Sequence, residues 1–376
     1  MKVSITGTGI TKFGELWDKS LLDLAFDAGN EAIKESGLKK EQINALFVGN
    51  MLSAKFDSQG HLGPAVAQVL GLVSPAFHIE AACASGGLAI HLAAQAIEAG
   101  EYENVLVLGA EKMTDVSTAE AASGLMGAAS EEERDAGLTF PGLYALMAQA
   151  YFAKYQVSQK DVAYASVKNH LHASLNENAQ FGNKITVEQV LKSMEIANPL
   201  KLLDCSPISD GAAAVVLSKK ESKKPFISAS STKTDTLSLS QRKTLTEIIA
   251  AQEAAKSAYR SAGVSPNDID LAEVHDCFSI AEVIAMEDLS FCKKGEGAKL
   301  IKTGKTTIGG KMPVNTSGGL KACGHPVGAT GVKQVVEITR QLEGRLTKRQ
   351  VKNPKIGLTH NVGGTGATVV VNIIQN

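Results

Sequence analysis

Apolar residues recur at helical spacing in two widely separated stretches of the chain. Each stretch places small apolar side chains on one stripe, which predicts a helix with one buried face. The stripe residues are Leu21, Ala25, Ala28 and Ala32, and then Ala251, Ala254, Ala255, Ala258 and Ala262. Gly37 follows the first stripe and Gly263 the second, and a glycine there predicts the end of a helix. Strand-like runs come next, at 45–48 and 271–274, so the same order of elements occurs twice.

A second pattern also occurs twice. Gly87 and Gly100 enclose one helical segment, and Gly331 and Gly344 enclose another, with each glycine pair 13 residues apart. Strand-like runs accompany both copies, at 3–6, 105–108, 226–229 and 355–359. The shared order and spacing predict two βαβα halves, each a sheet covered by helices. The alternative is coincidence between two ordinary α/β stretches.

The repeat divides the chain into two halves and an insertion. We assign residues 1–118 and 205–219 to the N-terminal half, and residues 225–376 to the C-terminal half. Residues 119–204 have no counterpart and form an inserted loop domain, and an insertion of this length is typical of a substrate-facing cap. Its predicted helices lie at 144–155 and 161–173. The lysine-rich stretch Lys219–Pro225 is expected to link the halves.

Charge and composition limit the classes of function. Lys and Arg total 38 against 39 Asp and Glu, and the net charge of −1 argues against bulk binding of nucleic acid or of an acidic membrane. Hydrophobic residues make up 44% and charged residues 20%, so the chain can bury a large core. Apolar runs end well short of the roughly 18 residues of a membrane span. The first predicted strand follows Met1 directly, so we expect no signal peptide.

The cysteines point to a reducing compartment and to one reactive position. There are five, an odd number without a CxxC pair, which fits a cytoplasmic protein better than a disulfide scaffold. Cys83 precedes a predicted helix, where free amides and the helix dipole lower a thiol pKa and supply an oxyanion site. The alternative for Cys83 is a buried structural role. We expect structural roles for Cys205, Cys292 and Cys323.

His275 and Cys277 follow the predicted strand of the second half. Side chains two residues apart on an extended chain point the same way, and active residues gather at the carboxyl ends of sheet strands. The alternative is a hydrogen-bonded core histidine and a core cysteine. Both readings stay open on the residues alone.

His325 precedes the helix that mirrors the one after Cys83. Its segment, 315–331, is a polar loop rich in Gly and Ala, so its backbone is expected to pass close to another group. The pseudo-symmetry puts Cys83 and His325 at equivalent helix starts, where they could face each other. A Cys/His pair is what an activated thiolate requires. A glycine turn at 360–366 could offer backbone N–H donors to an oxyanion.

These segments resemble the thiolase superfamily over essentially the whole chain. The similarity is closest to the thiolases related to sterol-carrier-protein thiolase, which include archaeal acetyl-CoA acetyltransferases. The matching text is AACASGG, HDCFSIAE, NTSGGLKACGHPVGATG and HNVGGTGA, with GLTFPGLYALMAQAYFAKYQVS and KNHLHASLNENAQF in the insertion. The resemblance implies an α/β fold, a five-layered αβαβα sandwich of two five-stranded halves, with the insertion as a CoA-facing loop domain.

The resemblance also implies site roles. Cys83 is expected to accept the acyl group, and His325 to activate it and later to donate to the thioester oxygen of the second substrate. Better-known thiolases carry an Asn in the HDCF motif and a proton-moving cysteine in the last glycine loop. Here residues 360–366 contain no cysteine, and Cys277 stands in HDCF, as in the sterol-carrier-protein subgroup. The resemblance therefore implies proton transfer by Cys277 and an oxyanion role for His275.

Two further positions complete the expected site. The amide of Gly363, with that of Cys83, is expected to hold the tetrahedral oxyanion. His170, in the inserted segment, is expected to line the CoA pocket. No metal site and no cofactor are expected, because the CoA thioesters are substrates.

The implied activity is reversible condensation of two acetyl-CoA molecules to acetoacetyl-CoA and CoA, through acyl-Cys83, at the start of the mevalonate pathway. The resemblance further implies a homodimer or homotetramer in the cytoplasm. It suggests a complex with hydroxymethylglutaryl-CoA synthase and a small scaffold protein.

Other functions remain open on the sequence. A degradative 3-ketoacyl-CoA thiolase of broader chain length would use the same residues. A decarboxylating ketoacyl synthase would use Cys83 with His275 and His325, and would leave Cys277 idle. A zinc site of His275, Cys277, Cys323 and His325, or a non-catalytic member of the fold, are further alternatives. A dinucleotide site at Thr6–Ile10 is disfavoured, since Lys12 breaks the G-x-G-x-x-G pattern.

Overall fold

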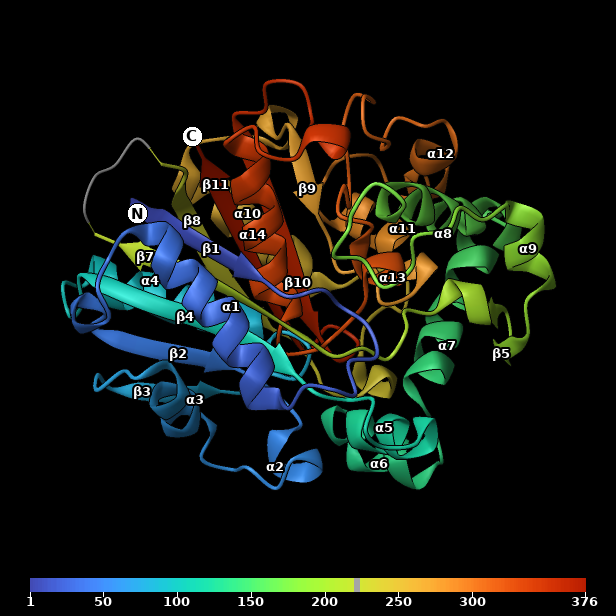
Figure 1. Ribbon diagram of the computed structural model, residues 1–376. Helices are drawn as coiled ribbons and strands as arrows, with labels where there is room; N and C mark the ends of the chain where they lie inside the picture. Colours follow the sequence, from blue (N-terminus) through green and yellow to red (C-terminus); the bar gives the residue numbers. More distant parts are fainter. Residues whose placement is uncertain (220–223) are drawn as a thin grey trace.

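A computed structural model describes residues 1–219 and 224–376, in which nine strands form one mixed sheet (Figure 1). The strand order is β3-β2-β4-β7-β1-β8-β11-β10-β9. The strands are β1 (Val3–Ile10), β2 (Ala45–Gly49), β3 (Ala76–Ile79), β4 (Asn104–Glu111), β7 (Gly211–Ser218), β8 (Phe226–Thr234), β9 (Leu271–Glu273), β10 (Ile356–Gly363) and β11 (Thr368–Gln375). Most of the expected linker, Lys219–Pro225, lies outside the described residues.

The sheet consists of two halves that meet at β1 and β8. These strands pair at Val3 with Ile227 and at Ser4 with Phe226. In the N-terminal half, β2 is parallel to β3 and β4, and β7 is antiparallel to β4 and β1. In the C-terminal half, β10 is parallel to β9 and antiparallel to β11, which is antiparallel to β8. The order β2-β4-β7-β1 thus corresponds to β9-β10-β11-β8, and the predicted duplication is confirmed.

The C-terminal half has only a single bridge where the N-terminal half has β3. Val314 bridges Ala272 in parallel, and the Asn315 N–H donates to the Ala272 carbonyl at 2.8 Å. Asn315 then adopts a φ of 56°, which turns the chain away from the sheet. The fifth strand expected in this half is therefore reduced to one paired residue, and the chain continues as the polar loop that leads to His325.

Helices cover the outer faces of both halves. The N-terminal half carries α1 (Leu21–Ser36) and α3 (Leu62–Leu70), and α10 (Ile249–Ala262) packs on β8 and β11. Both predicted stripes are buried, and both helices end at the predicted glycines, Gly37 with φ 71° and Gly263 with φ 68°. Left-handed φ is the geometry that glycine adopts without strain, which explains these helix ends.

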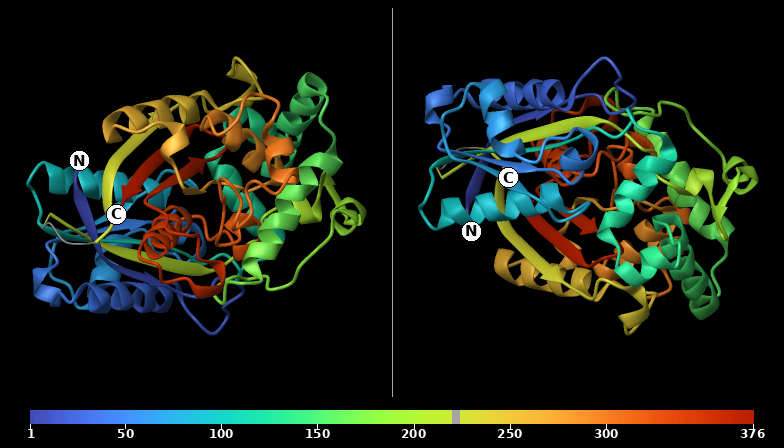
Figure 2. Two further views of the ribbon diagram at one scale, coloured as in Figure 1. Left: turned by 90° about the horizontal axis from the view of Figure 1, so that it is seen from above. Right: turned by 90° about the horizontal axis from the view of Figure 1, so that it is seen from below.

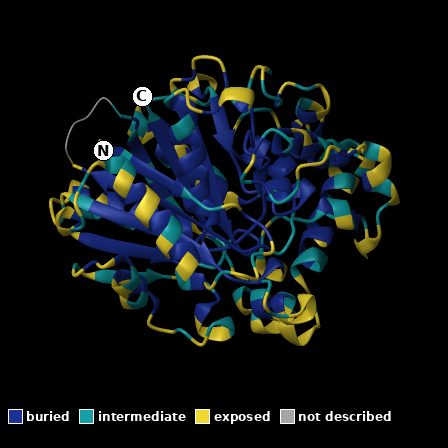
Figure 3. Cartoon of the chain, in the orientation of Figure 1, coloured by how far each residue is buried: buried dark blue, intermediate teal, exposed yellow. Residues whose placement is uncertain are grey.

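Two helices lie between the halves and contact strands of both. They are α4 (Ser85–Glu98) and α14 (Thr330–Leu342). Their N-terminal turns approach so closely that a Cβ on Gly331 would lie 2.1 Å from the Gly87 backbone nitrogen. The expected αβαβα layering is therefore confirmed. Figure 3 shows α14 and the central strands as buried, with exposed residues on the outer helices and loops.

The chain between β4 and β7 forms an excursion at one end of the sheets, away from both termini (Figure 2). Its elements are α5 (Thr118–Leu125), α6 (Glu131–Asp135), α7 (Phe140–Tyr155), α8 (Gln159–Ala173), α9 (Val187–Lys192), β5 (Glu195–Ala197) and β6 (Leu200–Lys201). The start of α7 was predicted four residues too late. Thr139 caps the helix by accepting the Gly142 N–H, and Pro141 suits its first turn.

The remaining elements are short or lie near the excursion. They are α2 (Ser53–Phe56), α11 (Ser279–Asp288), α12 (Gly297–Lys302) and α13 (Gly319–Cys323), with 3₁₀ turns at Lys40–Gln42, Met126–Ala128, Leu202–Asp204, Leu239–Gln241, Pro266–Asp268 and Thr347–Arg349. Within residues 1–219 and 224–376, the helices are too short or too polar to cross a bilayer.

Candidate active site

A cavity of about 420 Å³ lies where the two halves meet the excursion. The four predicted reactive residues line it: Cys83, His275, Cys277 and His325. Its wall from the excursion includes Tyr144 and Phe181. A wider hollow of about 620 Å³ beside β2 and β3 contains none of the predicted residues. The four predicted reactive residues therefore all line the smaller cavity.

Cys83 is presented by a sharp turn between β3 and α4. Ala82 adopts a φ of 52°, a left-handed conformation that is uncommon for a residue with a Cβ. The Ser85 hydroxyl holds this turn, because it accepts the Ala81 N–H at 2.9 Å and donates to the Ala82 carbonyl at 2.6 Å. Cys83 therefore stands immediately before α4 with a fixed backbone.

Three donor atoms converge in the cavity. The sulfur of Cys83 and one ring nitrogen each of His275 and His325 all lie within 4.8 Å of one another. The two imidazole rings meet edge to face, with centroids 5.1 Å apart. The close packing of α4 on α14 at Gly87 and Gly331 brings the two helix starts, and hence Cys83 and His325, to this point.

His325 is held in one tautomer by Thr330. The His325 Nδ1 lies 2.7 Å from the Thr330 hydroxyl, and that hydroxyl donates to the Pro326 carbonyl at 3.0 Å. Since a hydroxyl has one proton, the ring must donate from Nδ1, and Nε2 keeps a free lone pair. Burial lowers the pKa of His325 to about 3, so the ring is neutral. It can accept a proton from a thiol.

His275 is buried beside His325 and has a different set of partners. Its Nδ1 lies 3.3 Å from the side-chain nitrogen of Asn361. Its Nε2 is buried and has no hydrogen-bond partner among the described residues. Burial, with the charges of His325 and His360, lowers the pKa of His275 well below its usual value. This ring is also neutral.

Cys277 lies on the cavity wall just after β9. Burial raises the pKa of its thiol, and the nearby Tyr144 hydroxyl partly offsets that rise. Tyr144 is itself buried, its hydroxyl donates to the Gly364 carbonyl at 3.1 Å, and its ring packs on Phe278. Tyr144 was not singled out as a site residue from the sequence. Its spacing from Tyr151 on one helix indicates a core position and gives no sign of contact with Cys277.

The glycine turn after β10 faces Cys83. Gly363 is the last residue of β10, and a Cβ there would lie 2.5 Å from the Ala81 carbonyl oxygen. The amide that reaches the Cys83 sulfur is that of Gly364, which lines the cavity with a φ of 61°. Burial raises the pKa of Cys83 to about 12, and the Gly364 amide opposes this rise. Gly363 provides the close approach, and Gly364 provides the N–H donor.

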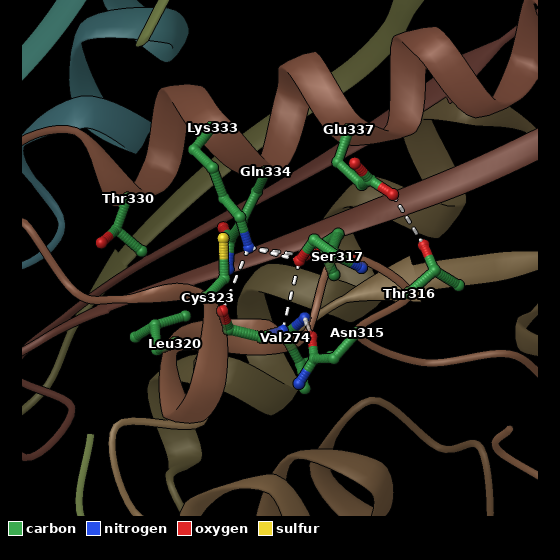
Figure 4. Close-up of polar contacts among 12 residues, drawn as sticks. Val274, Asn315, Thr316, Ser317, Leu320, Cys323, Thr330, Lys333, Gln334 and Glu337 are labelled. Carbon is green, nitrogen blue, oxygen red and sulfur yellow. Dashed lines mark hydrogen bonds and ion pairs between the residues drawn. The ribbon is translucent and has the colours of Figure 1, made fainter. Parts of the chain in front are cut away.

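A buried polar network supports the loop before His325 (Figure 4). Asn315 accepts the Val274 N–H at 2.8 Å, and the Ser317 hydroxyl donates to Glu273 at 2.6 Å. The Lys333 ammonium donates to both Ser317 and Glu273. Since every one of these groups is buried, the loop is anchored to the end of β9 and to Val274, directly before the segment that carries His275 and Cys277.

The other predicted positions lie apart from the reacting atoms. His170 is not among the cavity-lining residues; it is buried, donates from Nδ1 to the Asn183 carbonyl, and stacks on Phe181, which does line the cavity. Cys205 lies on the cavity wall, although a structural role was expected. Cys323 is buried and accepts from Asn176 at 3.7 Å, outside the group of three donor atoms. The donor set that could hold a metal ion is Cys83, His275 and His325.

Family models and known proteins match the whole chain. The model described as "Thiolase, N-terminal domain" matches residues 3–221, and "Thiolase C-terminal domain-like" matches residues 231–376. The chain is 46% identical to an acetyl-CoA acetyltransferase of Methanothermobacter thermautotrophicus, covering 99% of each chain. It is 33% identical to human sterol carrier protein 2, covering 98% of this chain and 71% of that protein. A solved structure described as an Ltp2-ChsH2(DUF35) aldolase superposes with a TM-score of 0.85 at 25% identity, covering 100% of this chain and 97% of the other.

Proposed function

The chain belongs to the thiolase family, and we propose that it is an acetyl-CoA C-acetyltransferase, which reversibly condenses two acetyl-CoA molecules to acetoacetyl-CoA and CoA. The observation that carries the proposal is the meeting of Cys83, His275 and His325 within 4.8 Å on a cavity that Cys277 also lines. The full-length similarity to an archaeal acetyl-CoA acetyltransferase supports the choice of acyl group.

The first half-reaction transfers an acetyl group to Cys83. Its pKa of about 12 means that the free thiol is protonated at neutral pH, so a base must act. His325 takes the proton on Nε2 while the sulfur attacks the thioester carbonyl. The amide of Cys83 and those of the glycine turn Gly363–Gly364 stabilise the oxyanion. The carbon–sulfur bond to CoA then breaks, the departing CoA thiolate takes the proton of the Cys277 thiol, and His325 keeps the proton from Cys83 on Nε2.

The second half-reaction forms the carbon–carbon bond. Cys277, as thiolate, removes an α-proton from a second acetyl-CoA, and the enolate oxygen accepts hydrogen bonds from His275 and His325. The α-carbon attacks the acetyl carbonyl on Cys83, and the bond from that carbonyl to Cys83 breaks. The Cys83 thiolate regains its proton from His325 Nε2, Cys277 keeps the α-proton as a thiol, and acetoacetyl-CoA leaves. Two cysteines are needed because one carries the acyl group while the other moves a proton.

The excursion supplies the wall that faces CoA in this proposal. We assign residues 119–204 to a CoA-facing loop domain between an N-terminal half, 1–118 with 205–219, and a C-terminal half, 225–376. Support comes from Phe181 on the cavity wall. His170 contributes indirectly, by stacking on Phe181 at a centroid distance of 5.6 Å. The CoA thioesters act as substrates, and the proposed cycle requires no further cofactor.

The proposal extends to assembly and setting. A homodimer or homotetramer is supported by β3, which is the outer strand of the sheet and carries the half-exposed Phe77. The resemblance to archaeal thiolases is the basis for proposing a cytoplasmic enzyme at the start of the mevalonate pathway, in a complex with hydroxymethylglutaryl-CoA synthase and a small scaffold protein. Sedimentation of the purified chain and co-purification from its source test these two points.

A second candidate is a decarboxylating ketoacyl synthase. It is favoured by one observation, the grouping of two histidines with one cysteine. A third is a degradative thiolase of broader chain length, which the same residues would serve.

Product analysis separates the three functions. With acetyl-CoA as sole substrate and no malonyl-CoA, the proposal predicts acetoacetyl-CoA and free CoA in equal amounts. Product that appears only with malonyl-CoA would establish the synthase instead. A higher kcat/KM for thiolysis of longer 3-ketoacyl-CoA than of acetoacetyl-CoA would establish the degradative thiolase. Cys83→Ser should abolish turnover, and Cys292→Ser, a half-buried cysteine away from the cavity, is the matched control.

A further inference from the structure

Asn361 is a polar residue in the middle of a buried strand. It lies on β10 with 1% of its surface exposed, and its side chain touches both halves of the site. Its Oδ1 accepts the Gly87 N–H of α4 at 3.0 Å. Because Gly87 N–H can only donate, this bond identifies the oxygen of the side-chain amide. Its Nδ2 donates to the Cys83 carbonyl at 2.9 Å. The reversed amide would place its oxygen against that carbonyl and its NH₂ against the Gly87 N–H.

The same NH₂ group lies 3.3 Å from His275 Nδ1. An amide nitrogen is a donor only, so His275 Nδ1 must accept, and in a neutral imidazole the proton then resides on Nε2. That Nε2 is buried without a hydrogen-bond partner among the described residues. A buried N–H without an acceptor destabilises the free enzyme, and a bound ligand oxygen would remove that penalty.

We propose that Asn361 is a positioning residue that holds His275 in the Nε2–H tautomer, so that the ring offers an N–H donor to the thioester oxygen. The inference rests on the proposed function for its substrate, but the tautomer itself does not depend on it. His275 and His325 then differ in kind. His325 presents a lone pair because Thr330 takes its Nδ1–H, and His275 presents an N–H because Asn361 donates to its Nδ1.

The assignment also bears on metal binding. With Nδ1 occupied by the Asn361 amide and Nε2 protonated, His275 has no free lone pair for a metal ion. The group of Cys83, His275 and His325 is therefore suited to acyl transfer rather than to a stable zinc site, although its atoms are close enough for one.

The test compares wild type with Asn361→Asp. The carboxylate is nearly isosteric but only accepts hydrogen bonds, so it draws a proton onto His275 Nδ1. Long-range ¹H–¹⁵N spectra of ring-labelled histidine report which nitrogens are protonated, and His275→Gln identifies the signal. We expect Nε2–H with a bare Nδ1 in wild type, and a protonated Nδ1 in Asn361→Asp. A wild-type ring protonated on Nδ1 would overturn the inference, and this readout needs no substrate.

Kinetics supply the second readout. Loss of a preorganised oxyanion donor costs about 10²–10³ in rate, so Asn361→Asp should lower condensation by about that factor. Condensation within about threefold of wild type would overturn the inference. The matched control is Asn372→Asp, because Asn372 is equally buried on the neighbouring β11 and donates to Thr359, away from the cavity. If wild type makes no acetoacetyl-CoA, the proposed function fails, while the spectra still decide the tautomer.

Discussion

Thr330 Oγ1 lies 2.7 Å from His325 Nδ1, and the same hydroxyl donates to Pro326, so the histidine must donate to the threonine. This leaves the lone pair of His325 Nε2 for the Cys83 proton. Thr330→Val removes the acceptor with little change in shape, and we expect the rate of Cys83 acylation to fall at least about tenfold, because general-base catalysis needs the correct tautomer.

The control for this change lies on the same helix. Thr339 is also buried on α14 and donates to Val335, but it is remote from the cavity. Thr339→Val should lower stability by a similar amount and leave acylation near the wild-type rate. Stopped-flow release of CoA measures the step, and equal rates in the two variants would show that the Thr330 contact is only structural.

Tyr144 is expected to tune Cys277. Its hydroxyl lies near the Cys277 sulfur and opposes the rise in the pKa of Cys277 caused by burial, so Tyr144→Phe should raise that pKa further. The pH profile of condensation should therefore move to higher pH, with a lower rate at pH 7, while acylation of Cys83 is retained. Tyr151→Phe, on the same helix but bonded to Glu287, is the control. An unshifted profile in Tyr144→Phe would contradict the contact.

Cys83 is expected to be a protonated thiol in the free enzyme. Its pKa of about 12 implies that its thiolate fraction, and hence its alkylation by iodoacetamide, rises about tenfold per pH unit between pH 7 and pH 9. The measurement uses Cys277→Ala without thioester, with the modified residue mapped by mass spectrometry. A plateau in the rate below pH 9 would mean that a standing thiolate exists.

The contact between α4 and α14 should tolerate no added carbon. Gly331→Ala would place a Cβ 2.1 Å from the Gly87 nitrogen, so the helices must move apart. We expect a loss of about 1–3 kcal/mol in the free energy of unfolding, with slower acylation because Cys83 and His325 separate. Gly182→Ala, at a position with open space around it, is the control. Equal denaturation midpoints for the two variants would contradict the packing.

The sequence allowed the duplicated fold and the pairing of Cys83 with His325 to be predicted, because both follow from repeated local patterns. The apolar stripes and the glycines that follow them predicted the buried faces and the C-terminal ends of α1 and α10. The contacts that tune the site could not be predicted this way. Asn361 and Cys83 are 278 positions apart, and only the tertiary fold sets their distance.

Other placements also depend on contacts that the sequence does not contain. The Gly364 amide lowers the pKa of the Cys83 thiol because β10 ends at Gly363, and strand ends are not fixed by composition. His170 looked like a pocket residue, but stacking on Phe181 places it behind the cavity wall. A buried polar residue in a strand, such as Asn361, is the one sequence signal that could have drawn attention to a positioning role.

The division of labour between the two cysteines is the central claim, and trapping the acyl group tests it most directly. Wild type and Cys277→Ala are incubated with acetyl-CoA, the acetylated residue is mapped by mass spectrometry, and acetoacetyl-CoA is measured in parallel. The account predicts acetyl on Cys83 in both proteins and acetoacetyl-CoA from wild type alone. Acetyl on Cys277 in wild type, or condensation by Cys277→Ala at the wild-type rate, would contradict it.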